Sequence, residues 1–201
     1  MIRFFDLFFS LIGFIILIPL FIVISIIIPI SSRGGIFYLQ SRVGKGNKDF
    51  RLIKFRSMAT GADQKGGLTI GMHDPRITRI GRFLRKFKLD ELPQLINVLK
   101  GDMSLVGPRP EIRKYVDLYT MEQKKILAVR PGITDYASVI YFNENEILGH
   151  ATDPEKTYIG EIMKAKIYLN MQFIDHPTIK NYFLILGKTL HRLAGYGRRE
   201  Q

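Results

Sequence analysis

The chain has 201 residues, a formal net charge of +12 at pH 7 and no cysteine. The length suits a single domain, and the lack of cysteine excludes a disulfide scaffold, a thiolate zinc site and cysteine-based catalysis. Residues 1–30 contain one base and one acid, so all of the net positive charge belongs to residues 31–201. A hydrophobic head on a cationic body is typical of membrane-associated proteins.

An almost unbroken apolar segment extends from Phe4 to Ile30. Of its 27 residues, 21 are Phe, Leu, Ile or Val. As a straight helix the segment would be roughly 40 Å long, which exceeds the ~30 Å hydrocarbon core of a bilayer. The apolar run is too long for a signal peptide and lacks an Ala-x-Ala cleavage site, so we expect it to stay on the mature protein.

Pro19 lies near the middle of this segment, where it removes a backbone donor and interrupts a regular helix. Two topologies follow: a kinked helix that spans the bilayer, or a re-entrant helix hairpin that enters and leaves through one face. Re-entry places Arg3, Arg33 and the basic body together on the cytoplasmic side, as the positive-inside rule favours. We therefore expect a re-entrant membrane segment over residues 1–32 and a cytoplasmic domain over residues 33–201.

Two short strands follow a Ser-Arg-Gly linker. The β-rich runs at 36–39 and 50–55 flank turn residues at 44–47, which predicts a β-hairpin. The glycine-rich stretch 60–75 is typical of a loop.

Arginines recur at every third position of residues 76–88, and apolar residues follow the same period. The spacing predicts an amphipathic helix. Its basic face is either an ordinary solvated surface or an interface with anionic head groups or phosphates.

Three more helices are predicted from start and stop signals. One begins near Asp90 and ends at Lys100-Gly101, one of about 20 residues opens at Asp153-Pro154, and one covers residues 178–194. The sequence therefore predicts an α+β fold that is mostly helical, with interfacial amphipathic helices and one small hairpin.

Asp90 and Glu91 are the only carboxylates among seven Lys and Arg in residues 76–100. Neighbours on a helix point about 100° apart, so the two acids suit separate roles, one as a nucleophile and one as a metal ligand. A helix N-terminus and the surrounding cations are expected to keep both ionised. The alternative is a pair of ordinary helix-capping acids.

Arg109 stands between two prolines, which restrict the backbone on both sides of it. A guanidinium presented from a stiff loop suits bidentate binding of phosphate. The alternative is an ordinary turn. The segment Arg130-Pro131-Gly132 has a similar composition.

Five motifs taken in order resemble the bacterial sugar transferases, and more narrowly the small monotopic phosphoglycosyl transferases. The resemblance covers nearly the whole chain. The motifs are Lys54-Phe55-Arg56-Ser57-Met58, Arg85-x-x-x-x-Asp90-Glu91-Leu92-Pro93-Gln94-Leu95, Asn97-Val98-Leu99-Lys100-Gly101-Asp102-Met103-Ser104, Gly107-Pro108-Arg109-Pro110 and Arg130-Pro131-Gly132-Ile133-Thr134.

This resemblance implies transfer of a phosphosugar from a UDP-sugar to undecaprenyl phosphate, with release of UMP, at the inner (cytoplasmic) membrane of a bacterium. It implies that Mg²⁺ is required, that Asp90 forms an aspartyl phosphosugar intermediate, and that Glu91 holds the metal with Asp90. Phosphate contacts are implied for Lys54, Arg85, Arg109 and Arg130. The residues after Thr134 depart from the pattern of the best-known family members. Within this stretch, Glu144 and Glu146 are further candidates for the site.

Two other functions are compatible with parts of the sequence. A membrane-tethered, non-catalytic binder of anionic lipid or nucleic acid would explain the high charge, but not two acids inside the most basic stretch. A metal-dependent phosphohydrolase could use Asp90 and Glu91 as ligands and would need no lipid acceptor. We expect membrane lipid, and no nucleic acid, among the partners.

Overall fold

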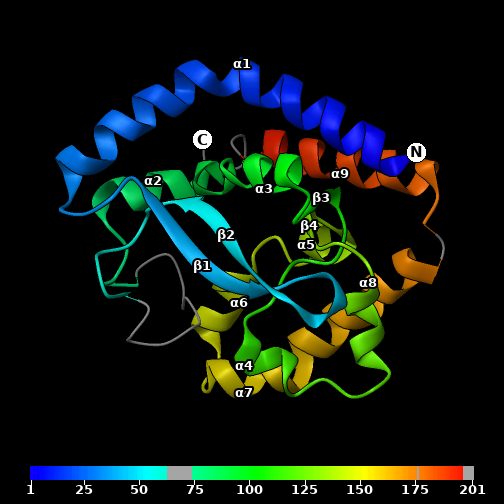
Figure 1. Cartoon of the computed structure of the whole chain (residues 1–201). Helices are drawn as coiled ribbons and strands as arrows, with labels where there is room; N and C mark the ends of the chain where they lie inside the picture. The colour runs from blue at the N-terminus through cyan, green and yellow to red at the C-terminus, as the bar shows by residue number, and fades with distance from the viewer. Residues whose placement is uncertain (63–73, 176, 197–201) are drawn as a thin grey trace.

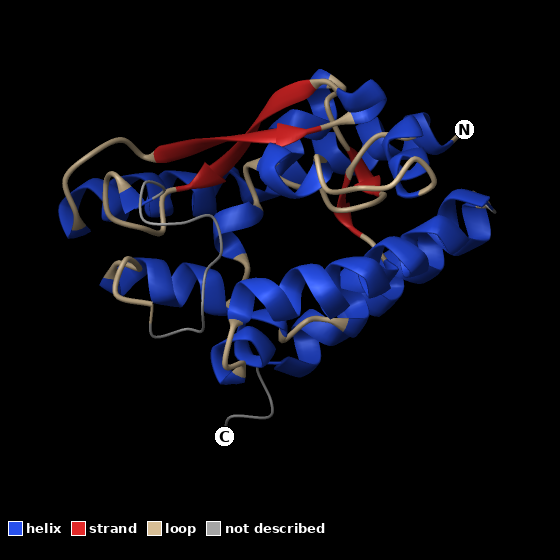
Figure 2. Cartoon of the chain, turned by 90° about the horizontal axis from the view of Figure 1, so that it is seen from below, coloured by secondary structure: helices blue, strands red, loops and turns tan. Residues whose placement is uncertain are grey.

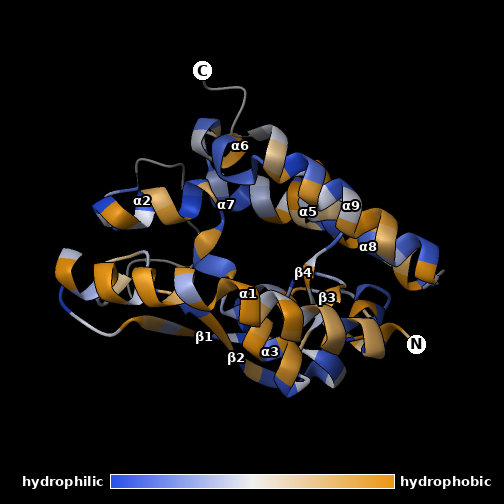
Figure 3. Cartoon of the chain, turned by 90° about the horizontal axis from the view of Figure 1, so that it is seen from above, coloured by the Kyte–Doolittle hydropathy of each residue, from blue (hydrophilic) through white to orange (hydrophobic). Residues whose placement is uncertain are grey.

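A computed structural model describes residues 1–62, 74–175 and 177–196 (Figure 1). The fold is mostly helical with a small sheet content. One long helix, α1, arches over a body whose halves are visible in Figure 3: β1, β2 and α3 lie with α1, and α5, α8 and α9 lie opposite. The helices are α1 Ile2–Ser31, α2 Arg79–Lys86, α3 Gln94–Lys100, α4 Arg113–Val116, α5 Tyr136–Ile140, α6 Glu144–His150, α7 Pro154–Thr157, α8 Met163–Asp175 and α9 Ile179–Tyr196.

The predicted hairpin is confirmed. β1 (Phe37–Val43) pairs antiparallel with β2 (Asp49–Phe55), with Phe37 opposite Phe55 and Val43 opposite Asp49. A short 3-10 turn, η1 (Lys45–Asn47), joins the strands, and Gly46 supplies the positive φ of 68° that the turn needs. Figure 2 shows the hairpin on one side of the molecule and the long C-terminal helices on the other.

A second, parallel strand pair was not predicted. β3 (Ser104–Val106) pairs with β4 (Gly132–Thr134), so that Ser104 lies opposite Gly132 and Val106 opposite Thr134. The two segments lie so close together that a Cβ on Gly132 would collide with the backbone of Gly107. The two proline-containing motifs, separate in the sequence, are therefore neighbours in space.

The apolar segment forms one helix, α1, that bends but does not divide into two antiparallel helices. The predicted re-entrant hairpin is not confirmed in that form. Pro19 and Pro29 both lie inside the helix, and a proline removes only one backbone bond of a ladder that otherwise continues. By length and composition α1 could cross a membrane, and only 11% of its most apolar window is buried.

Polar contacts fix the N-terminal end of α1 to the body. The buried Asp6 carboxylate accepts hydrogen bonds of 2.9 Å from the hydroxyl and backbone N–H groups of Ser104 and Leu105, respectively, and one of 3.0 Å from the Tyr182 hydroxyl. Arg3 donates to the carbonyl of Met103 at 3.3 Å. At the other end, Ile28 is completely buried in an apolar cluster with Phe55 and Leu84.

The amphipathic helix predicted at 76–88 is confirmed as α2, whose first turn is capped by the Thr78 hydroxyl accepting from Gly81 N–H. The helix predicted from Asp90 differs at its start. Asp90 and Glu91 belong to a 3-10 turn, η3 (Leu89–Glu91), and α3 begins only at Gln94 and ends, as predicted, before Gly101.

The remaining predictions concern the second half and one loop. The helix opening at Asp153 is confirmed, but it is interrupted between α7 and α8 by a π-helical turn, η5 (Tyr158–Ile162). α9 confirms the last predicted helix, and η4 (Gln123–Ala128) is a further 3-10 segment. Most of the loop predicted at 60–75 lies outside the described residues.

Candidate active site

A pocket of about 500 Å³ lies between the two halves of the body. Its size is that of a typical small-molecule site. Five of the six predicted site residues line it, namely Lys54, Arg85, Asp90, Glu91 and Arg109. Its wall also includes Gly13 and Leu17 of α1, so the apolar helix is part of the pocket.

Glu91 is held by two cations. Both terminal nitrogens of the Arg109 guanidinium contact the Glu91 carboxylate, one of them at 3.0 Å, and Lys54 Nζ lies 3.4 Å from Oε1. Burial alone would raise the pKa of Glu91, but the charges of Arg109 and Lys54 outweigh burial and hold that pKa well below its usual value. Glu91 is therefore a fixed anion.

Asp90 is in a different position, although it is the adjacent residue. It is 5% exposed, and among the described residues its carboxylate has no hydrogen bond or ion pair. Burial and the charge of Glu91 raise the pKa of Asp90 in spite of Lys54 and Arg85 nearby. The cations therefore lower the pKa of Glu91, as predicted. At Asp90 burial outweighs their effect, and the pKa is raised.

The residue that immediately precedes the turn with both acids is strained. Lys88 has a φ of 56°, a left-handed conformation that a lysine rarely adopts. Its Nζ lies 5.2 Å from the centre of the Phe142 ring, within the same pocket. Backbone strain of this kind is common where a turn must aim side chains into a site.

Lys54 and Arg85 reach the pocket from β2 and α2. Burial, helped by the charge of Arg109, lowers the pKa of Lys54 to about 8 against the opposing effect of Glu91. Arg85 Nε donates to the Ser57 hydroxyl at 2.9 Å, and burial lowers its pKa as well. Both side chains are therefore cations held in a poorly solvated place.

Arg109 is positioned through its backbone by Asp135, which sequence reasoning missed. The Arg109 N–H donates to Asp135 Oδ2 at 2.8 Å, and the same oxygen accepts from Asn170 at 2.8 Å. Asp135 also caps α5 by accepting from Ser138 N–H. The available signal in the sequence was an Asp just before a helix, because Asp is a preferred N-cap residue.

Arg130 does not line the pocket, so the structure does not bring it together with the other predicted residues. Its Nε donates to the Gly101 carbonyl at 2.9 Å, at the C-terminal end of α3. A cation at this end satisfies a free helix carbonyl, which gives Arg130 a structural task.

The pocket also contains Arg42, Glu111 and Lys166, which sequence reasoning missed, and Glu144, which was a sequence candidate. Arg42 pairs with Glu111 at 3.0 Å, and Glu111 also accepts from the Tyr158 hydroxyl. Lys166 pairs with Glu144 at 2.8 Å. Glu146, the other sequence candidate, is exposed and does not line the pocket.

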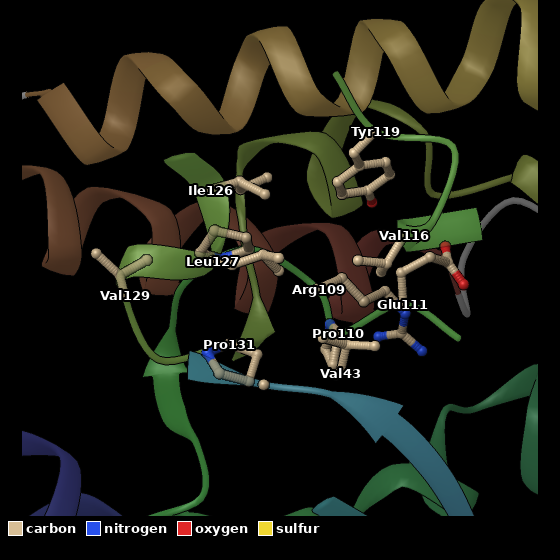
Figure 4. Close-up of a pocket in the computed structure, with 12 residues that line it drawn as sticks. Val43, Arg109, Pro110, Glu111, Val116, Tyr119, Ile126, Leu127, Val129 and Pro131 are labelled. Carbon is tan, nitrogen blue, oxygen red and sulfur yellow. The ribbon is translucent and has the colours of Figure 1, made fainter. Parts of the chain in front are cut away.

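A small cavity of about 20 Å³ lies behind the loop that carries Arg109 (Figure 4). Apolar side chains such as Val116 and Ile126 surround it, and the carboxylate of Glu111 borders it. The cavity has room for little more than a water molecule, so the larger pocket is the candidate ligand site.

The electrostatic balance of the large pocket favours anions. Seven cationic side chains line it against four carboxylates, a net charge of +3. The cations are Arg42, Lys54, Arg85, Lys88, Arg109, Lys166 and Arg192. Because these charges point into a cavity, the pocket suits a phosphorylated small molecule better than a nucleic-acid duplex.

The donor set can accommodate a magnesium ion together with a phosphorylated ligand. Among the described residues there is no group of three or more His, Cys, Asp or Glu side chains placed to bind a metal. Magnesium, however, commonly uses one or two carboxylates and completes its shell with substrate phosphates and water. Asp90 and Glu91 provide that partial set.

The chain is similar in sequence to undecaprenyl-phosphate sugar phosphotransferases. The chain is 41% identical over 185 residues to a UDP-N-acetylgalactosamine-undecaprenyl-phosphate N-acetylgalactosaminephosphotransferase of Aeromonas hydrophila, which covers 90% of this chain and 41% of that protein. It is 48% identical over 120 residues to a putative undecaprenyl-phosphate N-acetylgalactosaminyl 1-phosphate transferase of Bacillus subtilis, covering 60% of this chain and 67% of the relative.

A UDP-glucose:undecaprenyl-phosphate glucose-1-phosphate transferase of Escherichia coli is 36% identical over 189 residues, which are 89% of this chain and 38% of that protein. The chain thus spans about two fifths of the length of the Aeromonas and Escherichia relatives. The model of the family described as bacterial sugar transferase matches residues 1–195. The protein belongs to the bacterial sugar transferase family.

Proposed function

We propose that the protein is a membrane-associated phosphoglycosyl transferase that moves a phosphosugar from a UDP-sugar to undecaprenyl phosphate and releases UMP. Such a reaction is the first membrane step in the assembly of a cell-surface glycan. One observation carries the proposal: a buried, unpaired Asp90 carboxylate beside a fixed Glu91, in a pocket with an excess of cations.

The proposed reaction has two displacements at one phosphorus. An oxygen of Asp90 attacks the phosphorus that carries the sugar, the bond from that phosphorus to the oxygen of UMP breaks, and UMP leaves with the electron pair. A phosphate oxygen of undecaprenyl phosphate then attacks the same phosphorus, and the bond to Asp90 breaks. The lipid diphosphosugar departs and the Asp90 carboxylate is restored.

The residues of the chain suit these steps without a general base. A carboxylate is already a nucleophile when ionised, and the phosphate of the acceptor is an anion as well. Burial raises the pKa of Asp90, which makes its carboxylate more basic than an ordinary one. Because no described residue pairs with Asp90, no ion pair has to break before the attack.

The cations offset the charge that accumulates when a diphosphate meets a carboxylate. Lys54 and Arg109 already flank Glu91, and Arg85 approaches from α2. When bound with the donor, Mg²⁺ held by Glu91 and Asp90 would supply further neutralisation of the diphosphate. Glu91 then acts as an orienting anion, which suits its lowered pKa.

The relatives support the choice of substrates. The names of the Aeromonas and Escherichia proteins specify a UDP-sugar donor and undecaprenyl phosphate as acceptor. A lipid acceptor also suits the pocket, since its wall includes Gly13 and Leu17 from the exposed apolar helix.

We further propose that residues 1–32 enter and leave the membrane through its cytoplasmic face, with residues 33–201 as a cytoplasmic catalytic domain at the bacterial inner membrane. Both ends of α1 contact the same body, Asp6 through Ser104 and Ile28 through Phe55. A spanning helix would carry its ends to opposite sides of the bilayer. The bend in α1 allows the middle to dip while both ends stay at one surface (Figure 1).

Two further helices fit an interfacial position beside α1. Phe83 of α2 is 52% exposed and Phe87, which caps its C-terminal end, is 42% exposed, next to the basic residues of that helix. On α9, Leu190 is 67% exposed, and Phe183 packs against Phe5 of α1. Exposed aromatic and apolar side chains with adjacent bases are typical of helices that lie in a membrane surface.

The decisive experiment is mass spectrometry of the intact protein, purified in lipid nanodiscs and mixed with a UDP-sugar and Mg²⁺ but no lipid acceptor. We expect an added phosphosugar mass that Asp90→Asn abolishes and Asp117→Asn, an exposed control, retains. An adduct that persists in Asp90→Asn would overturn the assigned nucleophile. Sustained release of free sugar phosphate without acceptor would instead identify a phosphohydrolase.

A further inference from the structure

The ion pair between Glu144 and Lys166 lies in the wall of the large pocket and has no role in the proposed reaction so far. Glu144 is the first residue of α6, and Lys166 lies in α8. Their side chains are 25% and 13% exposed, and Glu144 Oε2 lies 2.8 Å from Lys166 Nζ. Two elements distant in sequence therefore bring a largely desolvated pair to the edge of the cavity.

The pair has unused hydrogen-bonding capacity. An ammonium group has three donors, and a carboxylate accepts through two oxygens. Among the described residues, the only side-chain hydrogen bond of either group is the one that joins them, and Lys166 otherwise lies 5.5 Å from the centre of the Tyr158 ring. Donors and an acceptor are thus left available to a ligand.

The Arg42–Glu111 ion pair, which also lines the pocket, differs in this respect. Glu111 accepts from Arg42, from the backbone of Ile112 and from the Tyr158 hydroxyl, and Arg42 also donates to Gln40 and to the Pro110 carbonyl. That pair is saturated by the protein and fixes the loop next to Arg109. Of these two pairs, Glu144–Lys166 is the one open to a ligand.

The position of the pair relates it to the reacting centre. The charge of Glu144 is among the influences that raise the pKa of Arg109, so it lies within electrostatic reach of the group that holds Glu91. The moiety attached directly to the reacting phosphorus of a UDP-sugar is the sugar. A group beside the phosphate-binding cations is therefore placed to meet that sugar.

The chemistry of the pair fits hydroxyl groups better than the other parts of the substrates. Glu144 would repel a phosphate, and a polyprenyl chain offers nothing to an ion pair. A sugar hydroxyl both donates and accepts, so neighbouring hydroxyls can bond to the carboxylate and to the ammonium together. A site built from desolvated polar groups also rejects ligands that leave those groups without partners.

We propose that Glu144 and Lys166 bind the hydroxyl groups of the sugar in the UDP-sugar and determine which sugar is accepted. The inference rests on the proposed function, since it assigns the sugar end of that donor. It makes the pair a specificity determinant that acts on the substrate.

The test compares kcat/KM for a panel of UDP-sugars that includes epimers such as UDP-glucose and UDP-galactose, with UMP as a competing inhibitor. For Glu144→Gln and Lys166→Met we expect kcat/KM for the preferred sugar to fall at least ~10-fold, since each change leaves a polar partner unpaired. The ratio between epimers should change, while inhibition by UMP, which lacks the sugar, stays within about twofold. Glu146→Gln and Lys164→Met, exposed positions on the same two helices, should match the wild type.

A reversed pair, Glu144→Lys with Lys166→Glu, separates recognition from folding. It keeps an ion pair across α6 and α8, so a purely structural role predicts recovery of wild-type selectivity. We expect selectivity to remain altered. An equal loss for all sugars in the single variants, or full recovery in the reversed pair, would overturn the proposal.

Binding measured by calorimetry tests the inference without any measurement of turnover. The difference in affinity between a UDP-sugar and UDP measures the contribution of the sugar, and Lys166→Met should reduce that difference. An unchanged difference would overturn the sugar subsite. A wild-type protein that binds UDP-sugars with sugar preference yet transfers none would contradict the proposed function alone.

Discussion

The backbone N–H of Arg109 donates a 2.8 Å hydrogen bond to the side chain of Asp135, which also caps α5. The buried carboxylate of Asp135 therefore caps a helix and also positions the loop whose Arg109 binds Glu91. Arg109 acts on the site through its guanidinium, but the position of its Cα depends on Asp135.

Replacing Asp135 with Ala should impair activity and stability together. Three N–H groups, those of Arg109, Ser138 and Asn170, lose their acceptor, and unsatisfied buried donors cost about 1–3 kcal/mol each. Asp153→Ala is the matched control because Asp153 caps α7 at an exposed position by accepting from Lys156 N–H. Thermal unfolding should detect both variants, whereas UMP release should fall only in Asp135→Ala. Equal activity in the two would reduce Asp135 to an ordinary cap.

Arg109→Lys should lose far more activity than its retained charge suggests. A lysine cannot hold both oxygens of Glu91 with parallel hydrogen bonds. We expect a loss of about 10²-fold or more in kcat/KM, the size associated with removal of a directed donor. Arg113→Lys, an exposed arginine that binds Asn47 and Asp49, should stay near wild type. A similarly mild effect at Arg109 would show that only its charge matters.

The activity should fall as the pH rises through about 8, because Lys54 has its pKa lowered to about 8 by burial. Below that pH the ammonium faces Glu91 and the incoming phosphate, and above it the charge is lost. Lys54→Arg retains a cation, so the alkaline limb of the kcat/KM profile should move to higher pH. Lys54→Met should be weakly active at every pH. An alkaline limb that stays in place in Lys54→Arg would assign the titration to another group.

Glu91→Gln should differ from Asp90→Asn in its response to magnesium. The amide keeps the nucleophile but weakens metal binding, so raising the Mg²⁺ concentration should recover part of the lost activity. Asp90→Asn should not recover at any concentration. Titration of UMP release with Mg²⁺ measures both variants. A lack of any recovery in Glu91→Gln would restrict Glu91 to holding Arg109 and Lys54 in place.

Single cysteines on either side of α1 should both react only from the cytoplasm. The native chain has no cysteine, so labelling is free of background. Ile2→Cys reports one end, and Gly35→Cys reports the other. Gly34 is unsuitable because its φ of 124° is strained for any side chain and a Cβ there would collide with Arg56. Reaction of Ile2→Cys with a periplasmic reagent would restore a spanning helix.

Local patterns predicted what depends on neighbours in the sequence. The hairpin, the amphipathic α2 and the end of α3 at Gly101 follow from turn, periodicity and capping signals. The strands β3 and β4 have three residues each, too few for a periodicity, and they pair across more than twenty intervening residues. Pro19 suggested a division of α1, yet a proline removes only one backbone hydrogen bond, and the helix continues through it with a bend.

The site divides in the same way. The motifs identified Lys54, Arg85, Asp90, Glu91 and Arg109, which the fold gathers into one pocket. They could not show which of the two acids is paired, because Arg109 reaches Glu91 from 18 residues away. Tertiary contacts that no local pattern contains also bring Arg130 to the carbonyl at the end of α3 and pair Glu144 with Lys166.

The inclusion of Gly13 and Leu17 in the pocket wall has an energetic consequence for a lipid acceptor. Drawing a long isoprenoid tail into water would cost about 0.8 kcal/mol for every CH₂-sized group exposed. With the apolar helix forming one side of the cavity, the tail can stay in the bilayer while the phosphate alone moves into the cationic interior. Under the proposed function, a water-soluble donor would reach the pocket from a side not formed by α1, so each substrate would remain in its own solvent until the reacting groups meet.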